Sequence, residues 1–157
     1  MFRLAKLAHF IGLAAFLGSI LVFIVISNVS SNASLAELVT ARKMISAGTD
    51  ALTLPGMWLV AITGVWMGWR RHGFGQRFVQ FKMALMVLML LNAHLVVSPA
   101  VHGALDAATL SLAQGSLLPQ YAAAYRQESI FGALNVVLIL AAAVIGTWRM
   151  GLRPAAG

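Results

Sequence analysis

The sequence contains no cysteine, and only four of its 157 residues are Asp or Glu. The lack of thiols excludes disulfides, thiolate metal sites and cysteine nucleophiles. Charged residues make up 10% of the chain, whereas a soluble globular domain carries about 25%. Together with 61% hydrophobic residues and a mean hydropathy of +0.88, this scarcity of charge indicates a protein that is solvated by lipid.

Common enzyme motifs are missing as well. The sequence has no phosphate-binding loop, no Gly-x-Ser-x-Gly and no His-Glu-x-x-His. The acidic residues, Glu37, Asp50, Asp106 and Glu128, fall outside the hydrophobic runs or at their ends, which argues against a membrane-buried carboxylate relay. The net charge of +7 comes from Lys and Arg at the ends of these runs, so it reports topology and not nucleic-acid binding.

Four hydrophobic runs, about 7–26, 52–69, 78–97 and 130–148, approach the roughly 20 residues that a spanning helix needs. The first run is too long for the core of a signal peptide, and no small-residue cleavage site follows it. The sequence therefore predicts one all-α domain over residues 1–157, an integral membrane four-helix bundle.

Basic residues mark one side of this predicted bundle. They are Arg3 and Lys6 near the N-terminus, Arg70, Arg71 and Arg77 in the second connection, and Arg149 and Arg153 near the C-terminus. The two longer connections are almost balanced in charge. The positive-inside rule then predicts an N-in/C-in, multi-pass protein with the short second connection in the cytoplasm.

Local signals refine the two longer connections. Ser34 and Glu37 form a predicted capping box that opens an amphipathic segment to about Ser46, which we expect on the membrane surface. Pro119 is expected to begin a helix that runs into the fourth span. Pro99 is expected to end or kink the third span.

Small residues are expected where helices approach closely in lipid. They form one face on the first span and a Gly-x-x-x-Gly pair on the second; the residues are Ala8, Gly12, Ala15, Ser19, Gly64 and Gly68.

Polar residues within the spans fall into two predicted layers. His9, Met67 and Lys82 lie near the cytoplasmic surface, whereas His94 is twelve positions after Lys82, about 18 Å further along a helix. His94, Asn135 and His102 make the outer layer, in which Asn135 is expected inside the bundle, accepting a hydrogen bond from the His94 ring.

Histidine in a membrane helix suggests haem, which uses an axial His opposite a second His or a Met. Because their depths differ, His9 and His94 are not expected to share one haem. One haem would use His9 with Met67 or a weak partner, or His94 with a partner at its own level; two haems would use one layer each. Arg3, Arg70, Arg71 and Lys82 are expected to neutralise propionates.

Other readings stay open. An intramembrane His can simply hydrogen-bond to a neighbouring helix, and Lys82 can extend to the interface. Met83, Met86 and Met89 recur every three residues. With His94 and His102 such a stripe could bind Cu(I), although methionines at this spacing more often serve packing.

Several short motifs also resemble a known family. They are Lys6-Leu7-Ala8-His9, Gly18, Pro55-Gly56-Met57, Thr63-Gly64, Phe81-Lys82 and His94. In these the chain resembles the four-helix membrane superfamily of HemJ-type protoporphyrinogen oxidases and CopD-like copper-resistance proteins. The resemblance implies a bacterial inner (cytoplasmic) membrane, bound haem b in the HemJ branch, and functional roles for His9 and Lys82.

One departure from this family points to an uncharacterised relative. HemJ proteins end the first span with a stretch that contains Pro and Arg, whereas residues 23–28 contain neither. We therefore expect a membrane-embedded b-type haem protein with a redox or electron-transfer role. The alternatives are a CopD-like copper-handling protein, a protoporphyrinogen oxidase and a non-catalytic membrane subunit. Expected partners are lipid and a quinone, a porphyrin or a membrane redox protein, with homo-oligomers possible and no nucleic acid.

Overall fold

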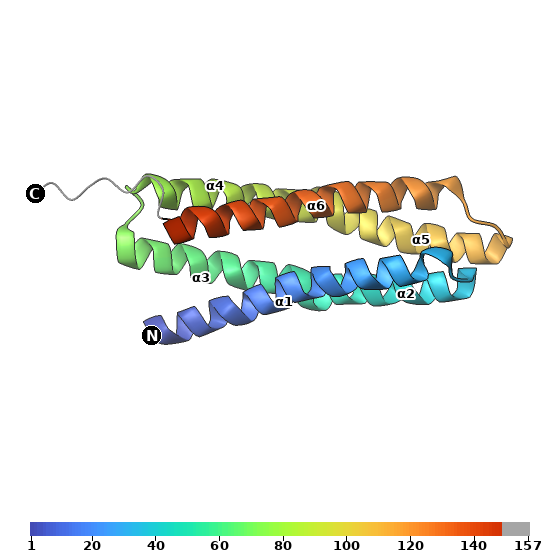
Figure 1. Ribbon diagram of the computed structural model, residues 1–157, viewed down its shortest axis with the longest axis horizontal. Coiled ribbons are helices and arrows are strands. Elements are labelled where there is room, and N and C mark those ends of the chain that lie inside the picture. The colour runs from blue at the N-terminus through green and yellow to red at the C-terminus, as the bar shows by residue number, and fades with distance from the viewer. Residues whose placement is uncertain (149–157) are drawn as a thin grey trace, which may run out of the picture.

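The computed structural model describes residues 1–148, which form helices joined by short connections (Figure 1). Arg149 and Arg153, used above for orientation, lie outside these residues. The first half comprises α1 (Phe2–Val29), the 3-10 turn η1 (Ser30–Asn32), α2 (Leu35–Gly48), the π-helical turn η2 (Thr49–Thr53) and α3 (Leu54–His72). The second half comprises α4 (Arg77–Asn92), the π-helical turn η3 (Ala93–Val97), α5 (Ser98–Gln114) and α6 (Pro119–Trp148).

Within residues 1–148, four helical rods are long and apolar enough to cross a membrane. Two of them are α1 and α6, and the others are composite: η2 joins α2 to α3, and η3 joins α4 to α5. The N-terminus, the α3–α4 turn and the end of α6 lie together at what we call the basic end, whereas the two other connections lie at the far end (Figure 1). The all-helical, four-helix prediction is confirmed.

Each composite rod contains a π turn immediately before a proline-bearing helix. Pro55 follows η2 closely and Pro99 follows η3 closely. A proline ring clashes with the carbonyl four residues earlier in an α-helix, and the wider π turn relieves this clash. Pro99 was expected to end or kink the third span, and it does not end it, because the helix continues to Gln114. The distortion next to this proline is the π turn η3.

Helices α1 and α3 pack closely through small residues. A Cβ placed on Gly12 would lie only 2.9 Å from the Gly56 carbonyl oxygen, so the two backbones touch. About two turns further along α1, the hydroxyls of Ser19 and Thr53 are 2.8 Å apart. The predicted small-residue face of the first span is confirmed, and it determines how near α3 can approach.

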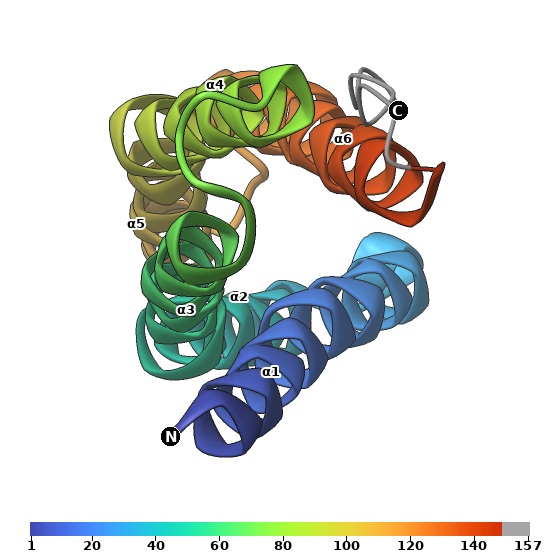
Figure 2. The ribbon, with the colours of Figure 1, turned by 90° about the vertical axis from the view of Figure 1, so that its left-hand side faces the viewer.

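The four rods form an open arrangement. Helix α1 packs on α3, α4 packs on α6, and α3 meets α4 near the basic end, but α1 and α6 scarcely contact each other within the described chain. Viewed from the basic end, the ribbon of α1 lies well apart from that of α6 (Figure 2).

At the far end, α2, α5 and α6 make a small core of their own, which includes Leu38, Val39, Ala104 and Tyr121. The capping box at Ser34 is confirmed, and so is the start of α6 at Pro119. The expectation that the segment after Ser34 lies flat on a membrane surface is wrong. Its apolar side is buried against α5, so it extends α3 along the bundle (Figure 1).

Candidate functional site

His9 is held between α1 and α3 by a hydrogen bond that defines its tautomer. Its Nδ1 lies 2.9 Å from the Thr63 hydroxyl oxygen, and that hydroxyl donates to the carbonyl of Leu59. A hydroxyl that donates to this carbonyl accepts from Nδ1–H, which is the tautomer in which Nε2 carries the lone pair. The His9 ring also has a hydrogen bond with the backbone of Val60.

Gly64 makes room for the ring. A Cβ on Gly64 would lie 3.3 Å from the His9 Cε1 atom. One member of the predicted Gly-x-x-x-Gly pair thus seats an imidazole, whereas Gly68 packs near Val79 of α4. The Thr63-Gly64 dipeptide is therefore the part of α3 that contacts the His9 side chain.

Lys82 joins His9 in the same layer, as the helical rise predicted. It is half-buried on α4 and acts on the His9 ring electrostatically. Its ammonium lies against α6, where a Cβ on Gly146 would be 2.6 Å from Nζ. The side chain therefore extends towards a neighbouring helix that has a glycine at the point of contact.

The other residues predicted for this layer lie on α3 or at the basic end. Met67 is half-buried on α3, one turn after Thr63. Arg70 is exposed, with its guanidinium 5.9 Å from the Trp66 ring centroid. Arg3 and Arg71 are also exposed at this end, so the basic residues lie at the end of the bundle that is nearer to His9.

His94 lies on the outside of the bundle. Its side chain is exposed, and its Nε2 accepts a hydrogen bond of 3.0 Å from the Trp58 indole N–H. The predicted pairing of His94 with Asn135 is wrong. The depth along the rod was estimated correctly, but the His94 side chain projects from η3 on the side where Trp58 meets it and not towards Asn135.

Asn135 is 4% exposed and so lies inside the bundle, as predicted. Its Oδ1 accepts a hydrogen bond of 2.8 Å from the Nδ2 group of Asn92. Asn92 Nδ2 also donates to the Phe131 carbonyl, which establishes that atom as the nitrogen. The amide pair links α4 to α6 across their interface.

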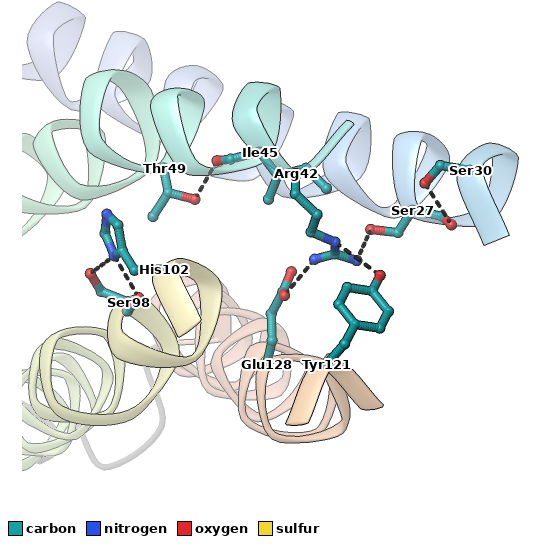
Figure 3. Close-up of polar contacts among 9 residues, drawn as sticks. All are labelled: Ser27, Ser30, Arg42, Ile45, Thr49, Ser98, His102, Tyr121 and Glu128. Atoms are coloured by element: carbon teal, nitrogen blue, oxygen red, sulfur yellow. Dashed lines mark hydrogen bonds and ion pairs between the residues drawn. The ribbon is translucent and has the colours of Figure 1, made fainter. Parts of the chain in front are cut away.

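His102 has both ring nitrogens occupied. Nδ1 lies 2.8 Å from the Ser98 carbonyl oxygen (Figure 3), and Nε2 lies 3.1 Å from a carboxylate oxygen of Asp50. Both neighbours are acceptors, so the geometry suits a doubly protonated imidazolium. This side chain bridges α5 to η2 and has no lone pair left for a metal.

Two of the three methionines of the predicted copper stripe, Met86 and Met89, lie in the apolar core. Met89 is buried in a cluster with Phe16, Met57 and Ile139, and Met86 packs against it. Within residues 1–148, no three His, Asp or Glu side chains come together as a metal site. Copper binding therefore stays a prediction of the sequence.

A buried ion pair at the far end was missed by the sequence reasoning. Arg42 is 1% exposed, and its guanidinium donates to Glu128 at 2.7 Å, to the Tyr121 hydroxyl at 3.1 Å and to Ser27 at 3.5 Å (Figure 3). Tyr125 lies 4.9 Å from the same group. The spacing of Tyr121, Tyr125 and Glu128 on one face of α6 was a signal that could have revealed a shared partner.

A cavity of about 270 Å³ lies between this ion pair and the middle of the bundle. Residues of α1, η2, η3 and α6 line it, and Asn135 and Glu128 are among them. Neither His9 nor Lys82 lines it, so the described chain has two separate polar regions, one in each half of the bundle.

The sequence matches no protein-family model, and no curated protein or solved structure is significantly similar to it. The resemblance to the HemJ and CopD superfamily stays a prediction.

Proposed function

We propose that this chain is a membrane-embedded b-type haem protein with an electron-transfer role, and that His9 is the axial ligand through Nε2. The observation that carries the proposal is the state of the His9 ring. Nε2 of His94 is occupied by Trp58 and both nitrogens of His102 are engaged, whereas the only side chain of the described residues that hydrogen-bonds to the His9 ring is Thr63, at Nδ1.

The surroundings of His9 are those that a ligating imidazole needs. A metal-bound His usually donates its other N–H to a nearby acceptor, which orients the ring and raises its basicity. The Thr63 hydroxyl is that acceptor. A haem requires only one or two protein ligands, so the lack of a larger ligand cluster among the described residues is compatible with it.

Charge at the basic end supports the same position. Haem propionates are anionic, and the exposed Arg3, Arg70 and Arg71, together with Lys82, lie at this end of the bundle. We infer that the basic end faces the cytoplasm of a bacterium and that the haem enters through the side where α1 and α6 remain apart. The apolar helices would supply a low dielectric that tunes the haem potential.

The test is the haem content of the protein purified in detergent after expression with excess haem. The wild-type protein should be red, with a Soret band that shifts on reduction by dithionite. His9→Ala should retain less than about a tenth of the haem, since the axial bond is lost. His94→Ala is the matched control and should retain the wild-type haem-to-protein ratio.

A second variant tests the role of Thr63. Thr63→Val keeps the shape of the side chain but removes the acceptor for Nδ1–H. We expect the haem to remain detectable with roughly tenfold weaker retention and a more positive reduction potential, because a less basic imidazole stabilises ferric iron less. Colourless wild-type protein, or full haem in His9→Ala with an unchanged reduced spectrum, would refute the proposal.

A further inference from the structure

The cavity in the far half of the bundle has a mostly apolar wall. Its wall includes Phe16, Ile20, Phe23, Val97, Val101 and Val136. It lies between α1 and α6, the pair of neighbouring rods that scarcely touch in the described chain.

Several polar groups of this wall have no partner among residues 1–148, and that of Asn135 is on the most buried residue of them. Asn135 uses Oδ1 to accept from Asn92, so its amide nitrogen, with two hydrogens, is left over. No residue among 1–148 accepts from that nitrogen. On the buried and half-buried residues of this part of the chain, every side-chain nitrogen or oxygen that lacks a hydrogen-bond partner has some exposed surface. The Asn135 Nδ2 group therefore has some exposed surface, and Asn135 is one of the residues that line the cavity.

An unpartnered donor in an apolar site is costly unless a ligand accepts from it. The donor calls for a ligand that is mostly apolar and carries a carbonyl oxygen at the depth of Asn135. A hydrocarbon lipid tail has no acceptor at all. A quinone ring has two carbonyl acceptors on a flat apolar body, and its isoprenoid tail can remain in the bilayer.

We propose that this cavity binds the headgroup of an isoprenoid quinone, with Asn135 Nδ2 donating to one ring carbonyl. The volume of about 270 Å³ suits one ring and not a larger cofactor, since pockets for drug-sized ligands run from about 300 to 1,000 Å³. The tail leaves between α1 and α6.

The quinone site is distinct from the proposed haem site. Its nearest lining residue on α1 is Phe16, seven positions from His9 and so about 10 Å along the helix. A quinone at this place would be a suitable electron partner for a haem at His9. Its binding requires only the cavity and the Asn135 donor, so it can be tested in protein that has no haem.

Gly132 offers a direct way to fill the cavity. It lines the cavity, and a Cβ placed on it would have nothing within 4 Å. Gly132→Leu should therefore occupy the ligand space without displacing the protein. Gly18 on α1 also has nothing within 4 Å of an added Cβ but does not line the cavity, so Gly18→Leu is the matched control.

The experiment is native mass spectrometry of the purified chain with added decylubiquinone, because the mass identifies whatever is bound. Wild type and Gly18→Leu should each carry one quinone, and Gly132→Leu should carry none. Asn135→Leu, which keeps the side-chain volume, should weaken quinone binding about tenfold, as expected for one lost hydrogen bond. Binding of decylbenzene, which has no carbonyl, should change less than about twofold.

Circular dichroism and thermal unfolding establish that each variant is folded. The proposal is overturned if the wild type binds no decylubiquinone, or if Gly132→Leu binds quinone as the wild type does. It is also overturned if phospholipid or a second copy of the chain fills the space between α1 and α6 instead of the quinone. Equal loss of decylubiquinone and decylbenzene in Asn135→Leu would refute the role of the Asn135 donor. Haem content does not enter any of these outcomes.

Discussion

The ion pair between Arg42 and Glu128 makes a quantitative prediction about stability. The side chain of Arg42 is 1% exposed and that of Glu128 is 14% exposed. Each charge has therefore lost most of its hydration, and its main compensation is the attraction of the other. We compare Arg42→Met, Glu128→Met and the double variant, because methionine fills a similar volume without charge or strong hydrogen bonds.

Either single substitution leaves one charge without its partner. Breaking a buried pair in this way costs about 3–5 kcal/mol. Glu128→Met should be the more damaging change, because the isolated Arg42 cannot reach water, whereas an isolated Glu128 is partly exposed. The double variant removes both desolvated ions. Its main remaining loss is the hydrogen bond between Arg42 and the Tyr121 hydroxyl, which should lower the free energy of unfolding by about 1 kcal/mol.

Equilibrium unfolding in mixed detergent micelles, followed by tryptophan fluorescence and circular dichroism, measures these differences. The double variant should lie within about 2 kcal/mol of the wild type and above both single variants. Hydrogen exchange over residues 35–48 reports whether the far end opens separately. If the two single costs simply add in the double variant, or if Glu128→Met costs less than about 1 kcal/mol, the pair is not energetically coupled and the reasoning is wrong.

Further predictions concern packing, capping and orientation. Gly12→Leu should lower the free energy of unfolding by about 1–3 kcal/mol by forcing α1 away from α3, whereas Gly18→Leu should change it little; thermal unfolding in detergent distinguishes them. Ser34→Ala should cost about 1 kcal/mol through loss of the capping box, seen as faster hydrogen exchange in the first turn of α2. Reporter fusions should read cytoplasmic at Gly73 and periplasmic at Gln114, and the reverse pattern would invert the proposed orientation.

Many features of the fold follow from the sequence alone. The number of rods, the capping box at Ser34 and the helix start at Pro119 were all predicted, because hydrophobic length and capping depend on neighbouring residues only. The depth of His9 relative to Lys82 was also predicted, since a helix rises by a constant distance per residue.

The direction in which each side chain points was decided only by the tertiary structure. Rise along a helix gives depth, but packing against neighbours determines which side faces the interior, so His94 was wrongly expected beside Asn135. Likewise, Arg42 and Glu128 are 86 positions apart, and nothing local identifies them as partners. The contact of His9 Nδ1 with Thr63 and the unpartnered amide of Asn135 emerge only once every neighbouring donor and acceptor has been placed, because a hydrogen-bonding group becomes available for a ligand when the folded chain leaves it unsatisfied.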